Sequence, residues 1–292
     1  MKIVKLKGGL GNQMFQYAFA KNIEKKTGEQ VKLDLSAYDS LNDDIRKPRI
    51  LKFNLSLPIA SKEDNYSICK LQHKGNSLGN MYKAKLFAEI LINRRYYFEW
   101  DRAPRNIDGL LKYDYFDGYW QCWEYIKEVF EDLRRDFTPK NELHTSTKEL
   151  MEVMQNQNSV FVGIRRGDYT LHTKRFGSFD QNYYERAMQY IEERVSSPVY
   201  YIFSNDIEWV KQNMNFGSRS IVYREQKDII DDFEDLILMM NCKHSIVVNS
   251  TYHWWGGRMN FDEGKIVVAP RQWFFDGSKI EIIPPEWIRL ES

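Results

Sequence analysis

An apolar segment runs directly into two arginines in the stretch Ser159-Val160-Phe161-Val162-Gly163-Ile164-Arg165-Arg166-Gly167-Asp168-Tyr169. The apolar part predicts a buried strand, and ligands of open α/β sheets bind where such strands end. Arginine matches the geometry of phosphate with paired donors and never loses its charge. An isolated arginine pair is more often a surface turn held by salt bridges. The residues at the ends of the other strands therefore decide between a turn and an anion site.

Strands and helices alternate through the second half of the chain. After Val160–Ile164, the pattern predicts helices at Gln181–Arg194, Ile207–Asn213 and Asp231–Asn241, and strands at Val199–Phe203, Ser220–Tyr223, Ser245–Val248 and Lys265–Ala269. This alternation predicts a parallel sheet with right-handed crossovers.

The first half also opens with a strand, a helix and a strand. Ile3–Leu6 and Val31–Leu35 are the strands, and the helix runs from about Asn12 to Thr27 after a glycine loop. The polar stretch Glu142–Lys148 marks a domain boundary. We therefore expect an α/β protein of two Rossmann-like domains, residues 1–145 and 146–292, with parallel sheets that face each other across a cleft.

Composition excludes several classes of protein. The 292 residues carry a net charge of +1, which argues against a bulk nucleic-acid binder. Three widely spaced cysteines fit buried, reduced thiols. The N-terminus has no signal-like segment and the chain has no apolar run long enough to span a bilayer, so we expect a cytoplasmic protein. One predicted helix, Tyr82 to about Tyr96, is basic and either is solvated or touches the inner face of the membrane.

Polar clusters come directly after three of the predicted strands in the second half. They are Arg165, Arg166 and Asp168; Ser204, Asn205 and Asp206; and Asn249, Ser250 and Thr251. Each of the last two clusters alone would be read as a helix N-cap. Together they converge on one edge of one sheet, where hydroxyls, helix-start amides and guanidiniums favour a phosphate-bearing ligand. The sequence contains no Asp-x-Asp pair for a metal ion, so the arginines would stabilise a departing diphosphate.

The glycine loop of the first half suggests a different ligand. Gly9 and Gly11 precede a helix, and Asp34 ends the next strand, which imitates a nicotinamide-dinucleotide fingerprint. The match is weak, because Met14 stands where the third glycine should be. The loop predicts close approach of the backbone to a ligand and leaves the ligand open.

Six segments closely resemble motifs of glycosyltransferase family 11, the α1,2-fucosyltransferases of bacterial type, in the family's order and across nearly the whole chain. They are Gly8-Gly9-Leu10-Gly11-Asn12-Gln13-Met14-Phe15-Gln16-Tyr17-Ala18, Gly118-Tyr119-Trp120-Gln121, Arg165-Arg166-Gly167-Asp168-Tyr169, Phe203-Ser204-Asn205-Asp206, Leu238-Met239-Met240-Asn241-Cys242-Lys243-His244 and Asn249-Ser250-Thr251-Tyr252-His253-Trp254-Trp255-Gly256.

The resemblance implies a GT-B-like fold and inverting, metal-independent transfer of L-fucose from GDP-fucose to O2 of a terminal β-galactoside in a glycan. It implies that Arg165 binds the donor diphosphate, with Arg166 in support. The expected donor-binding set is completed by Ser204, Asn205, Asp206, Asn249, Ser250 and Thr251, and Asn12 is expected near the fucose.

A base must accept the proton of the attacking hydroxyl. Asp168 is the first candidate, although it would equally well orient Arg166. His253 and a reaction without a dedicated base stay open.

Two positions depart from the family pattern. Gly163 stands where the arginine motif usually has histidine, and Tyr252-His253 replaces the usual Phe-Ser before the two tryptophans. Both departures leave the acceptor glycan open. A fucosyltransferase of another linkage, a nicotinamide-dependent oxidoreductase and a carbohydrate-binding protein without activity stay as alternatives.

Overall fold

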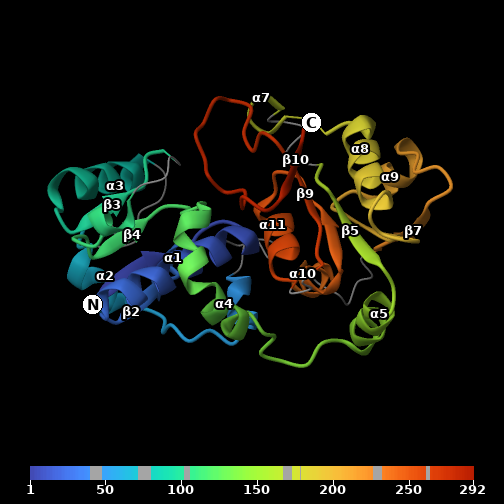
Figure 1. Ribbon diagram of the computed structural model, residues 1–292. Coiled ribbons are helices and arrows are strands. Elements are labelled where there is room, and N and C mark those ends of the chain that lie inside the picture. The colour runs from blue at the N-terminus through green and yellow to red at the C-terminus, as the bar shows by residue number, and fades with distance from the viewer. Residues whose placement is uncertain are drawn as a thin grey trace. The chain divides into compact units, whose positions relative to one another are not determined.

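The computed structural model describes residues 1–39, 48–71, 80–101, 106–166, 173–177, 179–225, 232–260 and 264–292 (Figure 1). The chain divides into two compact units, Met1–Lys140 with Lys279–Ile282, and Asn141–Ser278 with Ile283–Ser292. A short segment near the C-terminus therefore belongs to the first unit. That residues 1–145 form the acceptor-side domain and residues 146–292 the donor-binding domain stays a prediction.

The first unit contains a parallel sheet in the strand order β2-β1-β4-β3. Its strands are β1 (Lys2–Lys5), β2 (Val31–Asp34), β3 (Tyr96–Phe98) and β4 (Tyr115–Asp117). Its helices are α1 (Leu10–Thr27), α2 (Lys62–Ile68), α3 (Asn80–Ile92) and α4 (Phe130–Asp136), with 3-10 turns at Ser36–Tyr38, Arg49–Lys52, Ile107–Leu110, Trp123–Tyr125 and Lys127–Val129.

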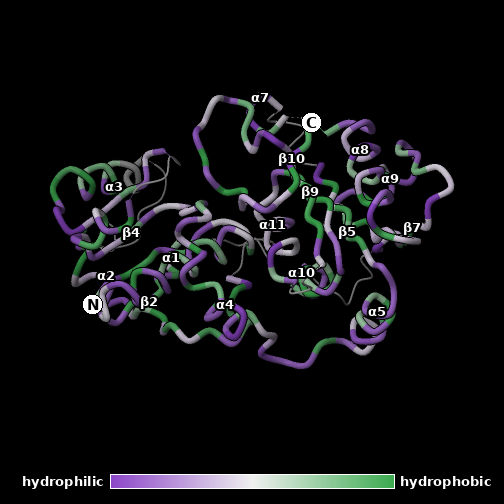
Figure 2. Tube along the Cα trace, viewed as in Figure 1, coloured by the Kyte–Doolittle hydropathy of each residue, from purple (hydrophilic) through white to green (hydrophobic). Residues whose placement is uncertain are grey.

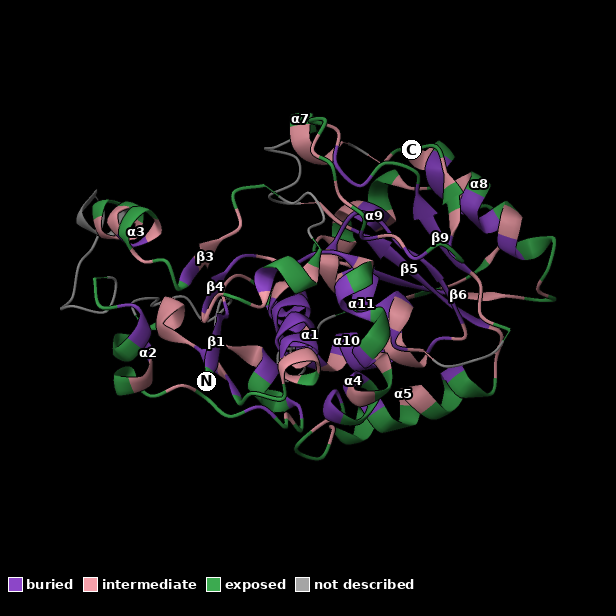
Figure 3. Cartoon of the chain, turned by 60° about the vertical axis from the view of Figure 1, so that its left-hand side comes forward, coloured by how far each residue is buried: buried purple, intermediate pink, exposed green. Residues whose placement is uncertain are grey.

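Helix α1 is buried along most of its length (Figure 3). Met14, Phe15 and Phe19 are fully enclosed. Its polar residue Gln16 is equally buried, and a buried amide needs hydrogen-bond partners. The helix ends at Thr27 and is capped by Gly28, whose φ of 67° lies in the left-handed region that glycine adopts without a steric penalty.

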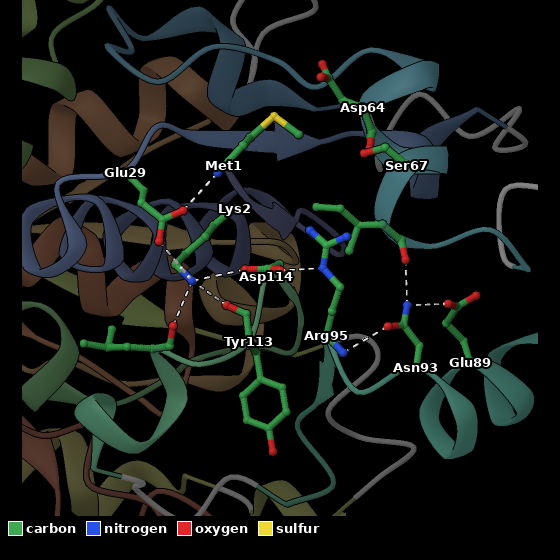
Figure 4. Close-up of polar contacts among 12 residues, drawn as sticks. Met1, Lys2, Glu29, Asp64, Ser67, Glu89, Asn93, Arg95, Tyr113 and Asp114 are labelled. Atoms are coloured by element: carbon green, nitrogen blue, oxygen red, sulfur yellow. Dashed lines mark hydrogen bonds and ion pairs between the residues drawn. The ribbon is translucent and has the colours of Figure 1, made fainter.

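The basic helix predicted for Tyr82–Tyr96 is shorter than expected. α3 ends at Ile92, and Tyr96 begins β3 instead. Asn93 makes the turn between them, because its amide donates to Glu89 and to the Ile68 carbonyl and its Oδ1 accepts from the Arg95 amide (Figure 4). Local hydrogen bonds of this kind compete with a continuing helix.

A network of charges joins the N-terminal ends of β1, β3 and β4. Lys2 donates to the carbonyl oxygens of Leu111 and Tyr113, each at 2.8 Å, and Asp114 bridges Lys2 and Arg95 (Figure 4). Burial opposes the charge of Asp114, but the two cations hold its pKa below the ordinary value. This network stabilises the sheet edge opposite the glycine loop.

The second unit contains a six-stranded parallel sheet in the order β10-β9-β8-β5-β6-β7. The strands are β5 (Ser159–Ile164), β6 (Val199–Ser204), β7 (Ser220–Tyr223), β8 (His244–Ile246), β9 (Val267–Pro270) and β10 (Ile288–Leu290). The helices are α5 (Thr145–Gln155), α7 (Thr173–Phe176), α8 (Gln181–Glu192), α9 (Ile207–Asn213), α10 (Asp232–Asn241) and α11 (Thr251–Arg258).

The apolar strands of this sheet form its core, as the green of β5 and β9 shows (Figure 2). The α/β class and the two parallel sheets are confirmed. The strands β3, β4 and β10 were not predicted. Each has three residues, too few for a periodic pattern to stand out. Among the described residues, none of the helices combines the length and the apolar composition that crossing a bilayer requires.

Candidate functional site

Strand β5 presents its two faces to different helices. Val160, Val162 and Ile164 pack in a core cluster with residues of α8. Phe161 lies on the other face, with its ring centroid 6.3 Å from that of His253 in α11. Alternation along the strand places Gly163 on the face of Phe161, and the arginine pair comes where β5 ends.

Arg166 is held by groups at the end of the neighbouring strand β6. Its backbone N–H donates to the Asn205 side chain at 2.9 Å, and its Nε lies 3.3 Å from a carboxylate oxygen of Asp206. The guanidinium carbon lies 3.3 Å from the ring centroid of Trp209, which is stacking distance for a cation over an indole. Arg166 is therefore oriented before any ligand arrives.

The polar residues of the turn after β6 also form hydrogen bonds that hold the turn and the start of α9. Ser204 Oγ accepts from the Asp206 amide at 3.0 Å, and Asp206 caps α9 by accepting from the Trp209 amide at 3.3 Å. This is the N-cap role that short polar residues before a helix usually play. Trp209 was not predicted as a site residue, and its place three residues after the cap was the one signal that could have found it.

The third cluster comes after β8 and leads into α11. Asn249 is buried, and its amide donates to the carbonyl oxygens of Phe176 and Trp273 at 2.7 and 2.9 Å. Ser250 is the N-cap residue of α11, but its hydroxyl makes no capping bond. The start of α11 thus keeps a hydroxyl and helix-start amides near each other, a combination that suits an anion.

Sheet pairing brings these clusters to the same edge. β5 lies between β6 and β8 and is parallel to both, with Ile164 paired to Ser204 and Val162 paired to Ile246. The two arginines, the Ser204–Asp206 turn and the start of α11 therefore all lie at the carboxyl end of this sheet. Asp168 lies outside the described residues.

A cavity of about 180 Å³ opens at this edge. Its lining includes both arginines, the Trp209 ring and, from α8 and α9 and the segments beside them, Phe179, Asp180, Gln181, Asn213 and Met214. An apolar and aromatic wall with a few polar groups is typical of a small-molecule site.

His253 lies against strand β5 at Gly163, two residues before the arginine pair. The residue is 5 % exposed, and its buried Nδ1 has no hydrogen-bond partner among the residues that the structure describes. Burial, with a smaller contribution from the charge of Arg165, lowers the pKa of His253 to about 3. An imidazole with so low a pKa is a weak proton acceptor, which argues against His253 as the base.

In the first unit, the glycine loop is held by two glutamines of the helix after it. Gln13 donates to the Gly8 carbonyl at 2.9 Å and accepts from the Ile50 amide at 3.0 Å. Gln16 accepts from the Lys7 amide at 2.9 Å and donates to the Gly118 carbonyl at 3.0 Å. These two glutamines hold the loop in its conformation. The backbone groups that they bond in turn satisfy the buried side-chain amides, which need hydrogen-bond partners.

Asn12 joins the glycine loop to the segment Gly118–Gln121. Its Oδ1 accepts from Gln121 at 2.7 Å. Trp120 in that segment has a φ of 56° and stacks on Phe19 with ring centroids 4.0 Å apart. A non-glycine residue held in the left-handed region marks a conformation that its surroundings impose, often at a functional site.

Asp34 occupies the position that a nicotinamide-binding fold would use for the ribose, but it is fully buried. Its carboxylate accepts from the Tyr115 hydroxyl, from the Asn65 amide at 2.7 Å, and from the Ser36 backbone amide and hydroxyl at 2.8 and 2.9 Å. Both oxygens are thus engaged within the protein, which argues against the oxidoreductase alternative. Within the described ranges, no group of three or more His, Cys, Asp or Glu is arranged to hold a metal ion.

Comparison with known proteins agrees with the sequence motifs. The family model described as Glycosyl transferase family 11 matches residues 1–291. The chain is 34 % identical to an alpha-1,2-colitosyltransferase of Escherichia coli over 99 % of both chains, and 31 % identical to the O-antigen biosynthesis glycosyltransferase WbnK of the same species over 98 % of this chain and 99 % of the relative.

A solved structure gives the fold. NodZ alpha-1,6-fucosyltransferase, crystallised with GDP, superposes with a TM-score of 0.50 at 13 % identity, covering 87 % of this chain and 90 % of NodZ. At this identity the likeness shows the fold alone, and the expected GT-B-like fold with two Rossmann-like units is confirmed.

Proposed function

This chain belongs to glycosyltransferase family 11, and on that premise we propose that it transfers L-fucose from GDP-fucose to O2 of a terminal β-galactoside in a glycan. The observation that carries the proposal is the meeting of Arg165 and Arg166 with the start of α11 at one edge of the second sheet. Fixed guanidiniums and helix-start amides are the groups that hold a diphosphate.

The two arginines would contact different parts of the donor, Arg165 the diphosphate and Arg166 the nucleoside. Arg165 would bind the diphosphate, together with Ser250 and Thr251. Arg166 is already fixed on Trp209 and Asp206 beside the 180 Å³ cavity, and that cavity would take the nucleoside. Asn205, which fixes the Arg166 backbone, would support the same site.

The reaction would be a single displacement with inversion. A bond forms between the acceptor oxygen and fucose C1 while the bond from C1 to the phosphate oxygen breaks, and its electron pair leaves with GDP. Arg165 would stabilise the negative charge that develops on the leaving phosphate, in place of a metal ion. The hydroxyl proton passes to a base, for which Asp168 is our proposal, and Asn12 would contact the fucose.

Colitosyl transfer is the second candidate. The relative that is 34 % identical over 99 % of both chains carries that activity in its name, so the deoxysugar of the donor needs a direct test. Transfer to a different hydroxyl of the acceptor is the closest rival within fucosyl transfer.

The test is incubation of the purified protein with GDP-fucose or with the corresponding colitosyl donor, each with a panel of galactosides, followed by linkage analysis of the products. We expect an α1,2-fucosylated galactoside, and EDTA should not change its rate of formation. Arg165→Ala should lower kcat/KM by about 100-fold or more, as the loss of a group that stabilises developing charge does. Arg194→Ala, at an exposed position of the same unit, is the matched control. Turnover of Arg165→Ala near that of the control would refute the diphosphate assignment.

A further inference from the structure

Gly163 and His253 compete for the same space. A Cβ placed on Gly163 would lie 2.5 Å from Nδ1 and 2.6 Å from Cγ of His253. These atoms belong to the part of the imidazole nearest the backbone. The ring centroid of His253 lies 6.3 Å from that of Phe161 and 6.0 Å from that of Tyr252. A close-packed ring cannot move aside cheaply. The imidazole of His253 thus occupies the place that a side chain at position 163 would take.

The two positions that depart from the family pattern therefore meet in one contact. At position 163 this chain has glycine where histidine is usual, and at position 253 it has histidine where serine is usual. The contact shows that the imidazole of His253, on helix α11, fills the space beside position 163 of strand β5.

Filling this space does not explain why the ring is an imidazole. Nδ1 is buried and has no partner within the described part of the chain. An unpaired buried polar atom lowers stability, and an apolar ring would avoid this cost. The ring lies against β5 two residues before Arg165, and it belongs to the first turn of α11, three residues after Ser250. Burial keeps the imidazole neutral, so it can give or accept a hydrogen bond without adding charge.

We infer that His253 is a binding residue of the donor site, whose ring nitrogen takes part in hydrogen bonding to the nucleoside diphosphate held by Arg165, and that Gly163 is the residue that makes room for it. The proposal rests on the donor site of the proposed function. It assigns this chain's two unusual residues to donor binding and not to the choice of acceptor.

Three variants test the pair. Gly163→Ala should lower the melting temperature by on the order of 5 °C, because the new methyl group overpacks the ring, and should cause no such loss when His253→Ser is also present. His253→Phe keeps the ring volume and removes the nitrogens. It should melt within about 3 °C of the wild type and bind GDP about tenfold more weakly in calorimetry, the effect of one hydrogen bond to a charged group.

The double variant G163H/H253S returns an imidazole to the space from the strand. We expect it to bind GDP within about threefold of the wild type, although each of its single changes weakens binding. GDP affinity of His253→Phe equal to that of the wild type would overturn the proposal, and so would a Gly163→Ala protein of unchanged melting temperature. Wild-type protein that binds GDP but transfers no sugar would overturn the proposed function alone, because the GDP affinities of the variants would still report on the pair.

Discussion

The buried imidazole of His253 should make the folded protein sensitive to acid in a defined pH range. Burial and the neighbouring Arg165 lower its pKa from 6.5 to about 3 in the folded state. Between these values the unfolded chain binds a proton that the folded protein does not, so stability is lost as the pH falls below about 6.5. The loss is at most about 1.4 kcal/mol per pH unit, or about 2 kcal/mol at pH 5 relative to neutral pH. Above pH 6.5 the ring contributes no pH dependence.

Urea unfolding at pH 7.5 and at pH 5, monitored by tryptophan fluorescence, measures this loss. The wild type and His253→Phe share every carboxylate, so the difference between their losses isolates the imidazole. We expect the wild type to lose about 2 kcal/mol more than the variant. Equal losses in the two proteins would refute the conclusion that the ring is buried and neutral. The same neutrality means that a rate change near pH 6.5 would have to come from another group.

Three further predictions concern other parts of the chain. Asp34→Ala should cost about 3 kcal/mol of stability, because it leaves several buried donors without an acceptor, and NAD should not raise the melting temperature of the wild type; stabilisation by NAD would restore the oxidoreductase alternative. Gly256→Ala should cost about 1–3 kcal/mol in urea unfolding, since its Cβ would lie 2.7 Å from the Cβ of Met239, and an unchanged midpoint would contradict this packing. Replacing Leu91 and Ile92, which are 68 % and 72 % exposed at the end of α3, by glutamate should reduce sedimentation with anionic vesicles and leave stability unchanged; equal sedimentation would argue against membrane contact through this helix.

Periodicity predicted much of the second unit because β5, β6 and α8 are long and regular. The helix Ile207–Asn213 and the strand Ser220–Tyr223 were predicted to the residue. The first unit was harder, since Tyr115–Asp117 has three residues and reads as an irregular aromatic segment. Its strand character comes from pairing with β1 and β3, and β1 lies far from it in sequence. The residue pattern within a short segment does not show which distant strand it will pair with.

The convergence of the polar clusters at one sheet edge could be predicted from the sequence, but the hydrogen bonds of each polar atom could not. Asn249, which stays a predicted donor ligand, also donates its side-chain amide to the carbonyl oxygens of Phe176 and Trp273. A sequence shows that a side-chain amide is present, but it does not show whether the amide will bond a backbone carbonyl or a ligand. The contact between Gly163 and His253 was hidden for the same reason, because it depends on how α11 packs on β5.

The arginine pair shows how adjacent residues of one type can acquire different tasks. Arg166 is fixed by Trp209 and Asp206, and it lines the cavity. The charge of Arg165 acts on His253 of α11. On this division, Arg166→Lys should weaken GDP binding about tenfold or more, since lysine keeps the charge but loses the planar stack and the Nε bond. On the proposed role of Arg165 at the leaving phosphate, Arg165→Lys keeps the charge but loses the paired donors, and it should lower kcat more than it weakens GDP binding. If the two variants showed the same ratio of kcat loss to loss of GDP affinity, the pair would act as one positive patch.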